Sequence, residues 1–451
     1  MTLEEEVIKL RAENTALRQL VEGLNAQVAA LTERLRELEE RKPDPPAFVK
    51  PNRPRWEGKE GGRKKRASEH NRGRKREQPT QIERHALERC PSCAYQLRGA
   101  SLQYRRQVIE LPEPQPVTVI EHQIIKRWCP VCQAWQAPRI NWQEQVVGQG
   151  RVGVRLAALV GYLRQSLRLP LRQIQAYLVA VHQVQLSLGE LSGLLQRMRQ
   201  HVQGAISALK ATAQAQTVLH GDETGWREDG QNGYVWCLAS GGTEAVRYYE
   251  YDASRSQAVV QRLLEGFGGH LVSDFLGSYN VYSGPHQRCW VHLLRDLKKL
   301  QEEQAEDGEV LAWALAVRWQ YERARSEAEG LAAEERQGLY QRLRRQTELL
   351  GLQYAQVKQH PCQALAKRLL RHLEELYQFV LHPQVPADNN LAERALRPVV
   401  VQRKISGGTR SPAGSQTRLG LASLFETWHA RGLNPLAEFQ RLLLQPAHAP
   451  P

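Results

Sequence analysis

Residues 217–222 read TVLHGD and residues 268–274 read GGHLVSD, and each is a strand-like run that ends on an aspartate. Farther along the chain, the segment DNNLAERALR begins like a helix and carries Glu393 in its opening turn. Two strand ends and one helix start can meet at the edge of a sheet. We therefore expect Asp222, Asp274 and Glu393 to form one site.

The sequence around these runs predicts a mixed sheet. TVLHGDETGW, YVWCLAS and AVRYYEYDAS are strand-like and are separated by turn signals, including DG and NG, which indicates an antiparallel meander. A helical stretch, SRSQAVVQRLLEGF, leads to the strand GGHLVSDF, a short strand HQRCW and the helix VHLLRDLKKL. This order predicts that Asp222 and Asp274 lie on adjacent central strands.

Carboxylates from two neighbouring strands and a facing helix can hold two Mg²⁺ ions about 3.5–4 Å apart, an arrangement that suits in-line phosphoryl transfer. Each acid also has a simpler explanation. Asp222 stands in a turn-rich segment and can cap a turn. Glu393 can form a capping box with Asn390, or it can pair with Arg397 one helical turn later.

Two further acids compete for these roles. Glu223 directly follows Asp222, and because side chains alternate along a strand we expect it to point away from the metal ions. Asp388 is the rival for the third position. We assign that position to Glu393 and expect Asp388 to cap the helix.

Residues 301–385 are rich in Ala, Leu, Glu and Arg and predict a helical insertion between Asp274 and Glu393. Trp313 and Trp319 lie close together in this insertion. We expect both to be core residues, and the alternative is that they stack on unpaired bases.

The composition indicates a polyanionic partner. The 451 residues carry a formal net charge of +14, and residues 42–76 alone hold thirteen Lys or Arg against four acids. No run of 18 apolar residues is present and the N-terminal sequence is acidic, so we expect no membrane association and a cytoplasmic location. The pattern of the seven cysteines indicates metal binding rather than disulfides in a reducing compartment.

Leucines recur every seventh residue from Leu3 to Leu38, mostly with Val at the companion heptad positions. This pattern predicts a parallel two-stranded leucine zipper, with Asn14 fixing its register. The alternative is a single amphipathic helix packed on its own protein. The residues expected at the homodimer interface are Leu3, Leu10, Asn14, Leu17, Leu24, Leu31 and Leu38.

Residues 41–80 are rich in Pro, Gly, Lys and Arg and contain too few apolar residues to form a core, so we expect a disordered linker. A solvated linker needs no further role. However, such a density of cations also binds DNA phosphates through counterion release. The cations expected to contact DNA are Lys64, Lys65, Arg66, Arg74, Lys75 and Arg76.

Two C-x-x-C pairs, Cys90 with Cys93 and Cys129 with Cys132, predict a structural Zn²⁺ site, because four thiolates complete the tetrahedral coordination of this ion. The gap between the pairs is longer than usual. We expect the intervening segment to form a hairpin that brings the pairs together. A redox role is the alternative.

Residues 141–210 contain several helical patterns whose spacing suits a helix-turn-helix. Ser187 is expected to cap the third helix. Arg197, Arg199 and Gln200 would then face a DNA groove. A purely structural helical bundle explains the pattern equally well.

Taken together, HGDETGWREDG, LVSDFLGSYN, CWVHLLRDL, DNNLAERALRPVVVQRKISGGTRS and SLFETWHARGLNP make the chain resemble transposases of insertion-sequence family 66, the TnpC type of the DDE superfamily. The resemblance runs nearly from end to end. It implies an RNase H-like core whose three catalytic, metal-binding acids are Asp222, Asp274 and Glu393, with two Mg²⁺ or Mn²⁺ ions as cofactors.

The resemblance also implies what the protein acts on. Family members recognise terminal inverted repeats in double-stranded DNA, cleave 3′ ends, transfer strands into target DNA and act beside accessory proteins of the same element. A bacterial, nucleoid-associated location follows. Two alternatives remain, namely a catalytically silent zipper-and-zinc DNA-binding regulator and a structure-selective RNase H-like nuclease.

Residues beside the three acids can assist them. CWVHLLRDL contains a C-x-x-H-x-x-R signature that places His292 and Arg295 on one helix face, where His292 can position the site and Arg295 can contact phosphate. The alternative is a buried Cys289 and a hydrogen-bonded His292. Further cations expected at the DNA backbone are Arg394, Arg397, Arg403 and Lys404.

The expected architecture is therefore a multidomain α+β protein. Its parts are a leucine-zipper coiled coil (1–40), a basic disordered linker (41–80), a zinc ribbon-like domain (81–140), a helical DNA-binding region (141–210), the first part of an RNase H-like α/β catalytic core (211–300), a helical insertion (301–385), the second part of the core with the Glu393 helix (386–410) and a C-terminal helical tail (411–451).

Overall fold

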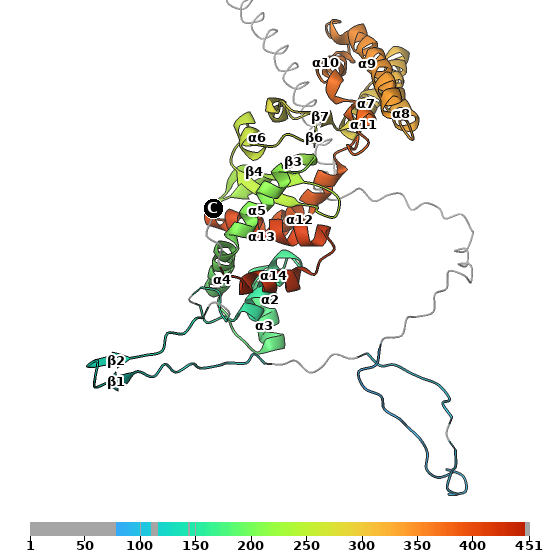
Figure 1. The fold of residues 1–451 in the computed structure, drawn as a ribbon. Coiled ribbons are helices and arrows are strands. Elements are labelled where there is room, and N and C mark those ends of the chain that lie inside the picture. Colours follow the sequence, from blue (N-terminus) through green and yellow to red (C-terminus); the bar gives the residue numbers. More distant parts are fainter. Residues whose placement is uncertain (1–77, 100, 110–115, 143–144, 149, 447–451) are drawn as a thin grey trace, which may run out of the picture. The chain divides into compact units, whose positions relative to one another are not determined.

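The computed structural model describes residues 78–99, 101–109, 116–142, 145–148 and 150–446 (Figure 1). The chain divides into two compact units, Met1–Leu111 and Pro112–Pro451. The predicted leucine zipper and the six named cations between Lys64 and Arg76 lie outside the described residues. Thirteen α-helices and a five-stranded mixed sheet are present in the described part of the chain.

The mixed sheet occupies the second unit and has the strand order β5-β4-β3-β6-β7. Antiparallel pairing joins β3 to β4 and β4 to β5, whereas β6 is parallel to both β3 and β7. The predicted meander and the predicted neighbourhood of the two aspartate strands are thus confirmed. The strands are β3 Val218–Glu228, β4 Gln231–Ala239, β5 Arg247–Asp252, β6 His270–Ser273 and β7 His286–Arg288.

The β3–β4 hairpin is closed by the two residues Asp229 and Gly230, whose φ angles are 48° and 77°. Two positive φ angles are typical of a type I′ turn, for which Asp-Gly is a favoured pair. The turn fixes the register of the hairpin, in which Asp222 lies opposite Cys237.

One face of the sheet is covered by α12 (Asn390–Ser406) and part of α13 (Pro412–Ala430). Alternate residues of β4, Val235 and Cys237, pack against Leu396 and Val399 of α12. On β5, the Tyr249 hydroxyl donates a hydrogen bond of 2.6 Å to the Ala395 carbonyl oxygen. These contacts hold α12 against β4 and β5, beside the strand that carries Asp222.

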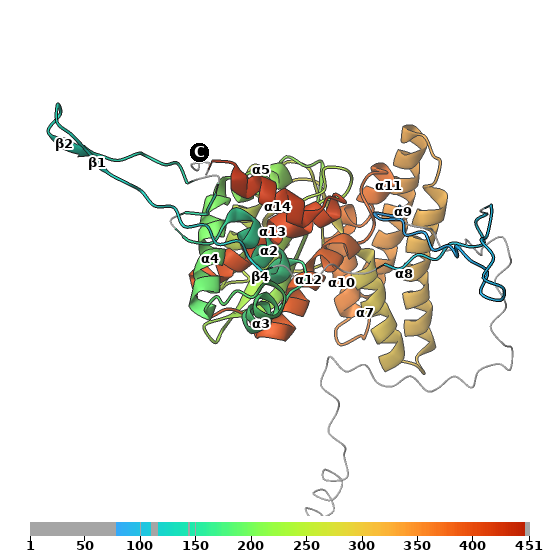
Figure 2. The ribbon, with the colours of Figure 1, turned by 90° about the horizontal axis from the view of Figure 1, so that it is seen from below.

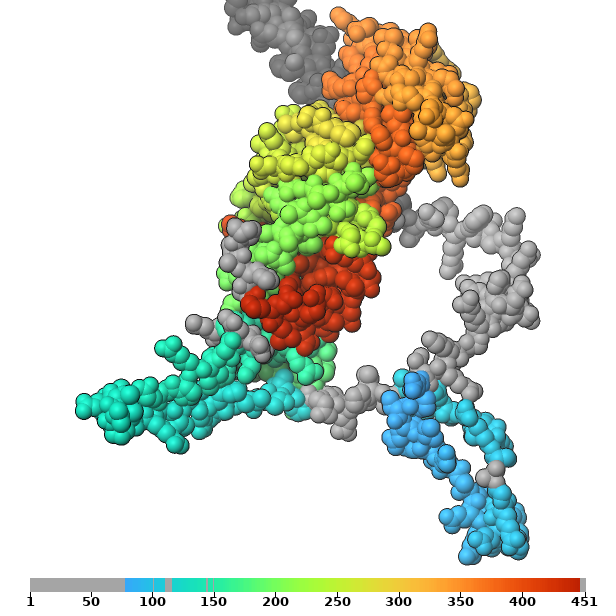
Figure 3. All heavy atoms as spheres, viewed as in Figure 1, coloured from blue at the N-terminus to red at the C-terminus, as the bar shows by residue number. Residues whose placement is uncertain are grey.

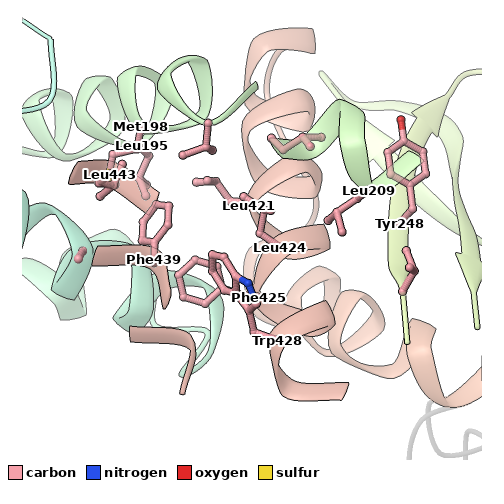
Figure 4. Close-up of a cluster of buried hydrophobic side chains, with 14 of the residues drawn as sticks. Leu195, Met198, Leu209, Tyr248, Leu421, Leu424, Phe425, Trp428, Phe439 and Leu443 are labelled. Carbon is pink, nitrogen blue, oxygen red and sulfur yellow. The ribbon is translucent and has the colours of Figure 1, made fainter. Parts of the chain in front are cut away.

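The other face of the sheet joins a larger core shared with the helices that precede and follow it (Figure 4). Leu421, Leu424 and Phe425 of α13 are buried there, so the C-terminal helices pack into this core. The helices of this core are α2 Val154–Gln165, α3 Leu171–His182, α4 Leu188–His201, α5 Gln203–Gln214, α6 Gln257–Leu263, α13 and α14 Pro435–Leu444.

Within this bundle, α4 is the helix expected to enter a DNA groove. Ser187 caps it as predicted and accepts a hydrogen bond of 3.1 Å from the Glu190 amide. Arg199, however, lies beside Gly420 of α13, where burial lowers its pKa, and only Gln200 of the three proposed contacts is well exposed. The packing favours the structural bundle that the sequence left open.

The predicted insertion is helical and has its own core, which begins with Trp290 (Figures 1 and 2). In Figure 3 its helices appear in orange as a lobe beyond the yellow segment that contains β6 and β7. The insertion and its lead-in helix comprise α7 Trp290–Glu303, α8 Gly308–Glu327, α9 Ala333–Ala355, α10 Gln363–Arg371, the 3₁₀ turn η3 Leu373–Glu375 and α11 Gln378–Leu381.

The two tryptophans of α8 differ in their surroundings. Trp313 is 3% exposed and donates a hydrogen bond of 2.9 Å to the Leu350 carbonyl oxygen. Trp319 is 57% exposed, and the Arg323 guanidinium lies over its ring, 4.9 Å from the ring centroid. The prediction that both are core residues is therefore wrong for Trp319.

The two cysteine pairs fall in different units, and all four thiols are free. A short antiparallel hairpin of β1 (Arg127–Cys129) and β2 (Ala134–Gln136) surrounds the second pair, where the Cys132 amide lies 3.4 Å from the Cys129 sulfur. The described residues from 94 to 126 contain no β-strand, so the hairpin lies at the second pair rather than between the pairs. The zinc site stays a prediction.

Candidate active site

Backbone register brings the first two acids together. In the parallel pair of β3 and β6, His220 lies opposite Val272. Continuing this register by two positions places Asp222 beside Asp274, which directly follows β6. The two aspartates therefore lie side by side, just past the last paired residues of β3 and β6. Asp274 directly follows β6, but β3 continues to Glu228, so the prediction that Asp222 ends its strand is wrong.

A buried amide ties the third acid to the same place. Asn389, the residue before α12, is fully buried, and its Nδ2 donates a hydrogen bond of 2.8 Å to the carbonyl oxygen of Gly221. Its Oδ1 lies 3.0 Å from Nδ1 of His220. Burial lowers the pKa of His220 to about 4, so the neutral ring donates its Nδ1 hydrogen to this oxygen. Glu393 follows one helical turn after Asn389.

Each carboxylate keeps an oxygen available. Oδ1 of Asp222 accepts a hydrogen bond of 2.9 Å from the Glu223 amide, and Oδ1 of Asp274 accepts one of 2.9 Å from the Leu276 amide. The second oxygen of each makes no hydrogen bond to another described residue. Oε1 of Glu393 is buried without a hydrogen-bond partner, and Nε2 of His292 lies 3.7 Å from it.

Negative charge accumulates at this point of the fold. Burial is the largest of the effects that raise the pKa of Asp222 to about 8, and the charges of Glu223, Asp274 and Glu393 raise it further. A hydrogen bond from the Glu223 amide opposes the rise. A partly buried group of mutually repelling carboxylates is stabilised when a cation binds to it.

The residues fit a divalent metal ion by their chemistry. Among the described residues, no group of three or more His, Cys, Asp or Glu side chains is close enough to surround a single ion. The three acids therefore do not surround one ion in this structure. Their oxygens are the hard ligands that Mg²⁺ and Mn²⁺ prefer, and the unpartnered, buried Oε1 of Glu393 lacks the partner that such an ion would supply.

The Glu223 carboxylate is paired with residues outside the three acids, although Glu223, Asp222 and Asp274 lie close enough for their charges to interact. Arg255 donates a hydrogen bond of 2.9 Å from Nε to its Oε1, and the Tyr279 hydroxyl lies 3.3 Å from its Oε2. Burial, followed by the nearby charge of Asp274, raises the pKa of Glu223. The pairing with Arg255 occupies the Glu223 carboxylate.

The simpler explanations for Glu393 do not hold. The helix cap is Asn389 rather than Asn390, and its side chain bonds to β3 instead of forming a capping box. Among the described residues Glu393 contacts His292 and not Arg397. The rival acid, Asp388, accepts a hydrogen bond of 3.0 Å from the Asn390 amide at the start of α12. The N-cap is Asn389, however, and not Asp388 as predicted.

The C-x-x-H-x-x-R signature lies at the start of α7. Cys289 is buried and its sulfur accepts a hydrogen bond of 3.2 Å from the Asn389 amide. His292 faces Glu393, whereas Arg295 is exposed. His292 is thus placed near the acids, and Arg295 is accessible from solvent.

The four predicted cations of α12 divide into two groups. Arg394, Arg397 and Lys404 are exposed. Arg403 is half-buried and donates hydrogen bonds to the Thr224 hydroxyl, at 3.2 Å, and to a β3 carbonyl oxygen. Arg403 therefore ties α12 to β3, a contact that the sequence did not predict.

Sequence reasoning also missed three buried residues that support the acids: His220, Asn389 and Arg288. The first two stand inside the quoted motifs HGDETG and DNNLAE, beside Asp222 and just before Glu393. Both could have been noticed in the sequence, because each is a polar residue close to a candidate metal ligand. Arg288 stands in the short HQRCW strand and carried no such signal.

The chain was found to be similar to a known family. Residues 149–417, which include all three acids, match the family model described as "Transposase IS66 family". The chain belongs to this family. The IS66 match begins at the helices before the sheet and ends within α13.

Two curated proteins of Sinorhizobium fredii (strain NBRC 101917 / NGR234) are similar to this IS66 family member. "Uncharacterized protein y4jO" is 31% identical over 169 residues, which cover 36% of this chain and 49% of that protein. "Uncharacterized protein y4qI" is 28% identical over 229 residues, which cover 45% of this chain and 42% of that protein. The chain thus spans less than half the length of each relative.

No described helix of the IS66 protein has a stretch that is long and apolar enough to pass through a membrane.

Proposed function

We propose that this protein is the DNA transposase of an insertion sequence. It binds the terminal inverted repeats of its element and catalyses metal-dependent 3′-end cleavage and strand transfer into target DNA. The observation that carries the proposal is that the β3–β6 register sets Asp222 beside Asp274, while Asn389 ties the start of the Glu393 helix to β3. Membership in the IS66 family supports it.

In this proposal the three acids hold two Mg²⁺ or Mn²⁺ ions. When bound, such ions lower the pKa of the attacking water or 3′-hydroxyl and stabilise the leaving oxygen. His292 positions the Glu393 carboxylate from α7. The exposed Arg394 and Arg397 hold the DNA backbone on the solvent side of α12.

We further propose that the catalytic core is RNase H-like, which the mixed five-stranded sheet with helices on both faces supports. The zipper-mediated homodimer, the DNA contacts of the basic tract and the role of accessory proteins rest on the sequence. The four-cysteine zinc site also stays a proposal, supported by two free C-x-x-C pairs in turn conformations.

The test uses the full chain with end DNA and target DNA, in Mg²⁺, Mn²⁺ or Ca²⁺. We expect wild-type protein to nick the 3′ ends and join them to target DNA in Mg²⁺ or Mn²⁺. Asp274→Asn and Glu393→Gln should abolish both steps while retaining binding to end DNA. Asp388→Asn is the matched control, because asparagine keeps an oxygen that can accept from the Asn390 amide.

Each alternative has its own outcome. Metal-dependent nicking that survives in Asp274→Asn refutes the catalytic assignment. Nicking by wild-type protein without joining identifies a structure-selective nuclease. Binding of end DNA by wild-type protein with neither nicking nor joining identifies a DNA-binding regulator.

A further inference from the structure

Arg288, at the end of β7, is a guanidinium with no exposure to solvent. Its Nη1 donates a hydrogen bond of 2.8 Å to the Asp274 carbonyl oxygen and lies 3.3 Å from the Ser273 hydroxyl. Its Nη2 donates one of 2.6 Å to Oδ1 of Asn280. Its Nε donates to Oε2 of Glu375, which comes from the 3₁₀ turn η3 of the insertion. One side chain thus joins the backbone of a proposed metal ligand to the insertion.

The segment around η3 is fastened to the sheet by further bonds. Gln287 of β7 is fully buried, and its amide donates a hydrogen bond of 3.1 Å to the Leu376 carbonyl oxygen and accepts one of 3.0 Å from the Phe379 amide. The Trp290 indole also donates to the Leu376 carbonyl oxygen, at 2.5 Å. Residues 375–379 therefore have a fixed position against β7.

The Glu375 carboxylate is held in its charged form. Burial by itself would raise its pKa, but the hydrogen bond from His372 and the charge of Arg288 outweigh that effect, and the pKa is lowered to about 2. A buried guanidinium needs a charged partner of this kind, because an unpaired charge is poorly tolerated in a protein interior.

We propose that Glu375 is a positioning residue for Asp274 and acts through Arg288, so that the helical insertion helps to build the metal site. This inference rests on the proposed role of Asp274 as a metal ligand. Without Glu375, Arg288 loses its charged partner and reorients toward solvent. The Asp274 carbonyl then loses its strongest donor, and the carboxylate shifts relative to Asp222.

Loss of such a supporting contact typically weakens metal affinity by about 10–100-fold. The direct test is Mn²⁺ binding by the full-length protein, followed by electron paramagnetic resonance of free Mn²⁺, together with the Mg²⁺ dependence of nicking. Glu375→Gln should raise the Mn²⁺ dissociation constant and the half-saturating Mg²⁺ concentration by about this factor.

The neighbouring residue provides a matched control. Glu374 belongs to the same turn but accepts hydrogen bonds from the Tyr340 hydroxyl and from Nε of Arg344, the latter at 2.6 Å, both within the insertion. Glu374→Gln should bind Mn²⁺ like the wild type. A merely structural role for the insertion predicts instead that both variants behave alike.

The inference is overturned if folded Glu375→Gln binds Mn²⁺ with wild-type affinity. If that variant does not fold, Arg288→Lys decides. Lysine keeps the charge that pairs with Glu375 but lacks the guanidinium nitrogen that donates to the Asp274 carbonyl oxygen. Wild-type Mn²⁺ affinity in Arg288→Lys therefore also overturns the inference. The two proposals fail separately: nicking that survives in Asp274→Asn refutes the catalytic assignment, whereas an inactive Asp274→Asn with wild-type Mn²⁺ affinity in Glu375→Gln refutes only the positioning role.

Discussion

Asp222→Asn is expected to stabilise the metal-free protein while it abolishes DNA cleavage. Asparagine has nearly the shape of aspartate and keeps an oxygen that can accept from the Glu223 amide. It lacks the charge that burial and the neighbouring acids oppose. The substitution therefore removes an electrostatic cost of the empty site together with a ligand of the occupied one.

The sign of the effect follows from the pKa of Asp222, which the fold raises from 3.8 to about 8. A raised pKa means that the folded protein binds the proton more tightly than the unfolded chain. The stabilisation is fully present below pH 3.8 and is lost as the pH rises through 8. One pKa unit corresponds to about 1.36 kcal/mol, so wild-type protein should lose up to about 4 kcal/mol between pH 5 and pH 8 from this group.

The assay is urea denaturation in the presence of a chelator, followed by tryptophan fluorescence, since Trp226 and Trp236 are buried in the sheet. At pH 8, Asp222→Asn should exceed the wild type in unfolding free energy by up to about 5 kcal/mol. At pH 5 this difference should fall to about 1.5 kcal/mol. Mn²⁺ at a hundred times its dissociation constant should add about 2.7 kcal/mol to the wild type and much less to the variant.

The reasoning is refuted if Asp222→Asn is no more stable than the wild type at pH 8. A gain in stability that is the same at pH 5 and pH 8 also refutes it. Such a gain would come from packing or from the unfolded chain rather than from the proton equilibrium of this carboxyl.

Two further predictions concern residues that are not themselves proposed metal ligands. Asn389→Ala leaves two buried hydrogen-bonding groups of β3 unpaired at about 1–3 kcal/mol each, so urea denaturation should show a loss of roughly 2–5 kcal/mol, with slower nicking by the protein that remains folded. Trp313→Ala should cost about 3–5 kcal/mol in the same assay, whereas Trp319→Ala should stay within about 1 kcal/mol because its ring is exposed.

The sheet could be predicted because its signals are local. Strand-like runs bounded by turn signals mark β3 to β5, and the Asp229–Gly230 pair fixes one turn. A helix followed by a strand returns the chain parallel to β3, which places Asp274 beside Asp222. The same local signals therefore correctly predicted that Asp222 and Asp274 lie on neighbouring strands or directly after them.

The long-range parts of the fold could not be predicted in this way. α13 lies between the sheet and the helical bundle and is apolar on several sides, so its periodicity did not reveal which face is buried. Trp319 stands six residues after Trp313, and this spacing turns its ring away from the insertion core. Which buried polar groups pair across the core, as His220 does with Asn389, depends on tertiary packing alone.

The position of Glu393 is independent of the length of the insertion that precedes it. The insertion leaves and rejoins the sheet at one point, because the Trp290 amide donates a hydrogen bond of 3.0 Å to the Ala387 carbonyl oxygen and the Asn389 amide donates one to the Cys289 sulfur. The chain between these bonds leaves the sheet and returns to the same point. α12 therefore starts from that point whatever the length of the intervening segment. What the insertion can change is Asp274, since Glu375 reaches back to the sheet through Arg288. The core therefore sets the position of Glu393, whereas the insertion can adjust the position of Asp274.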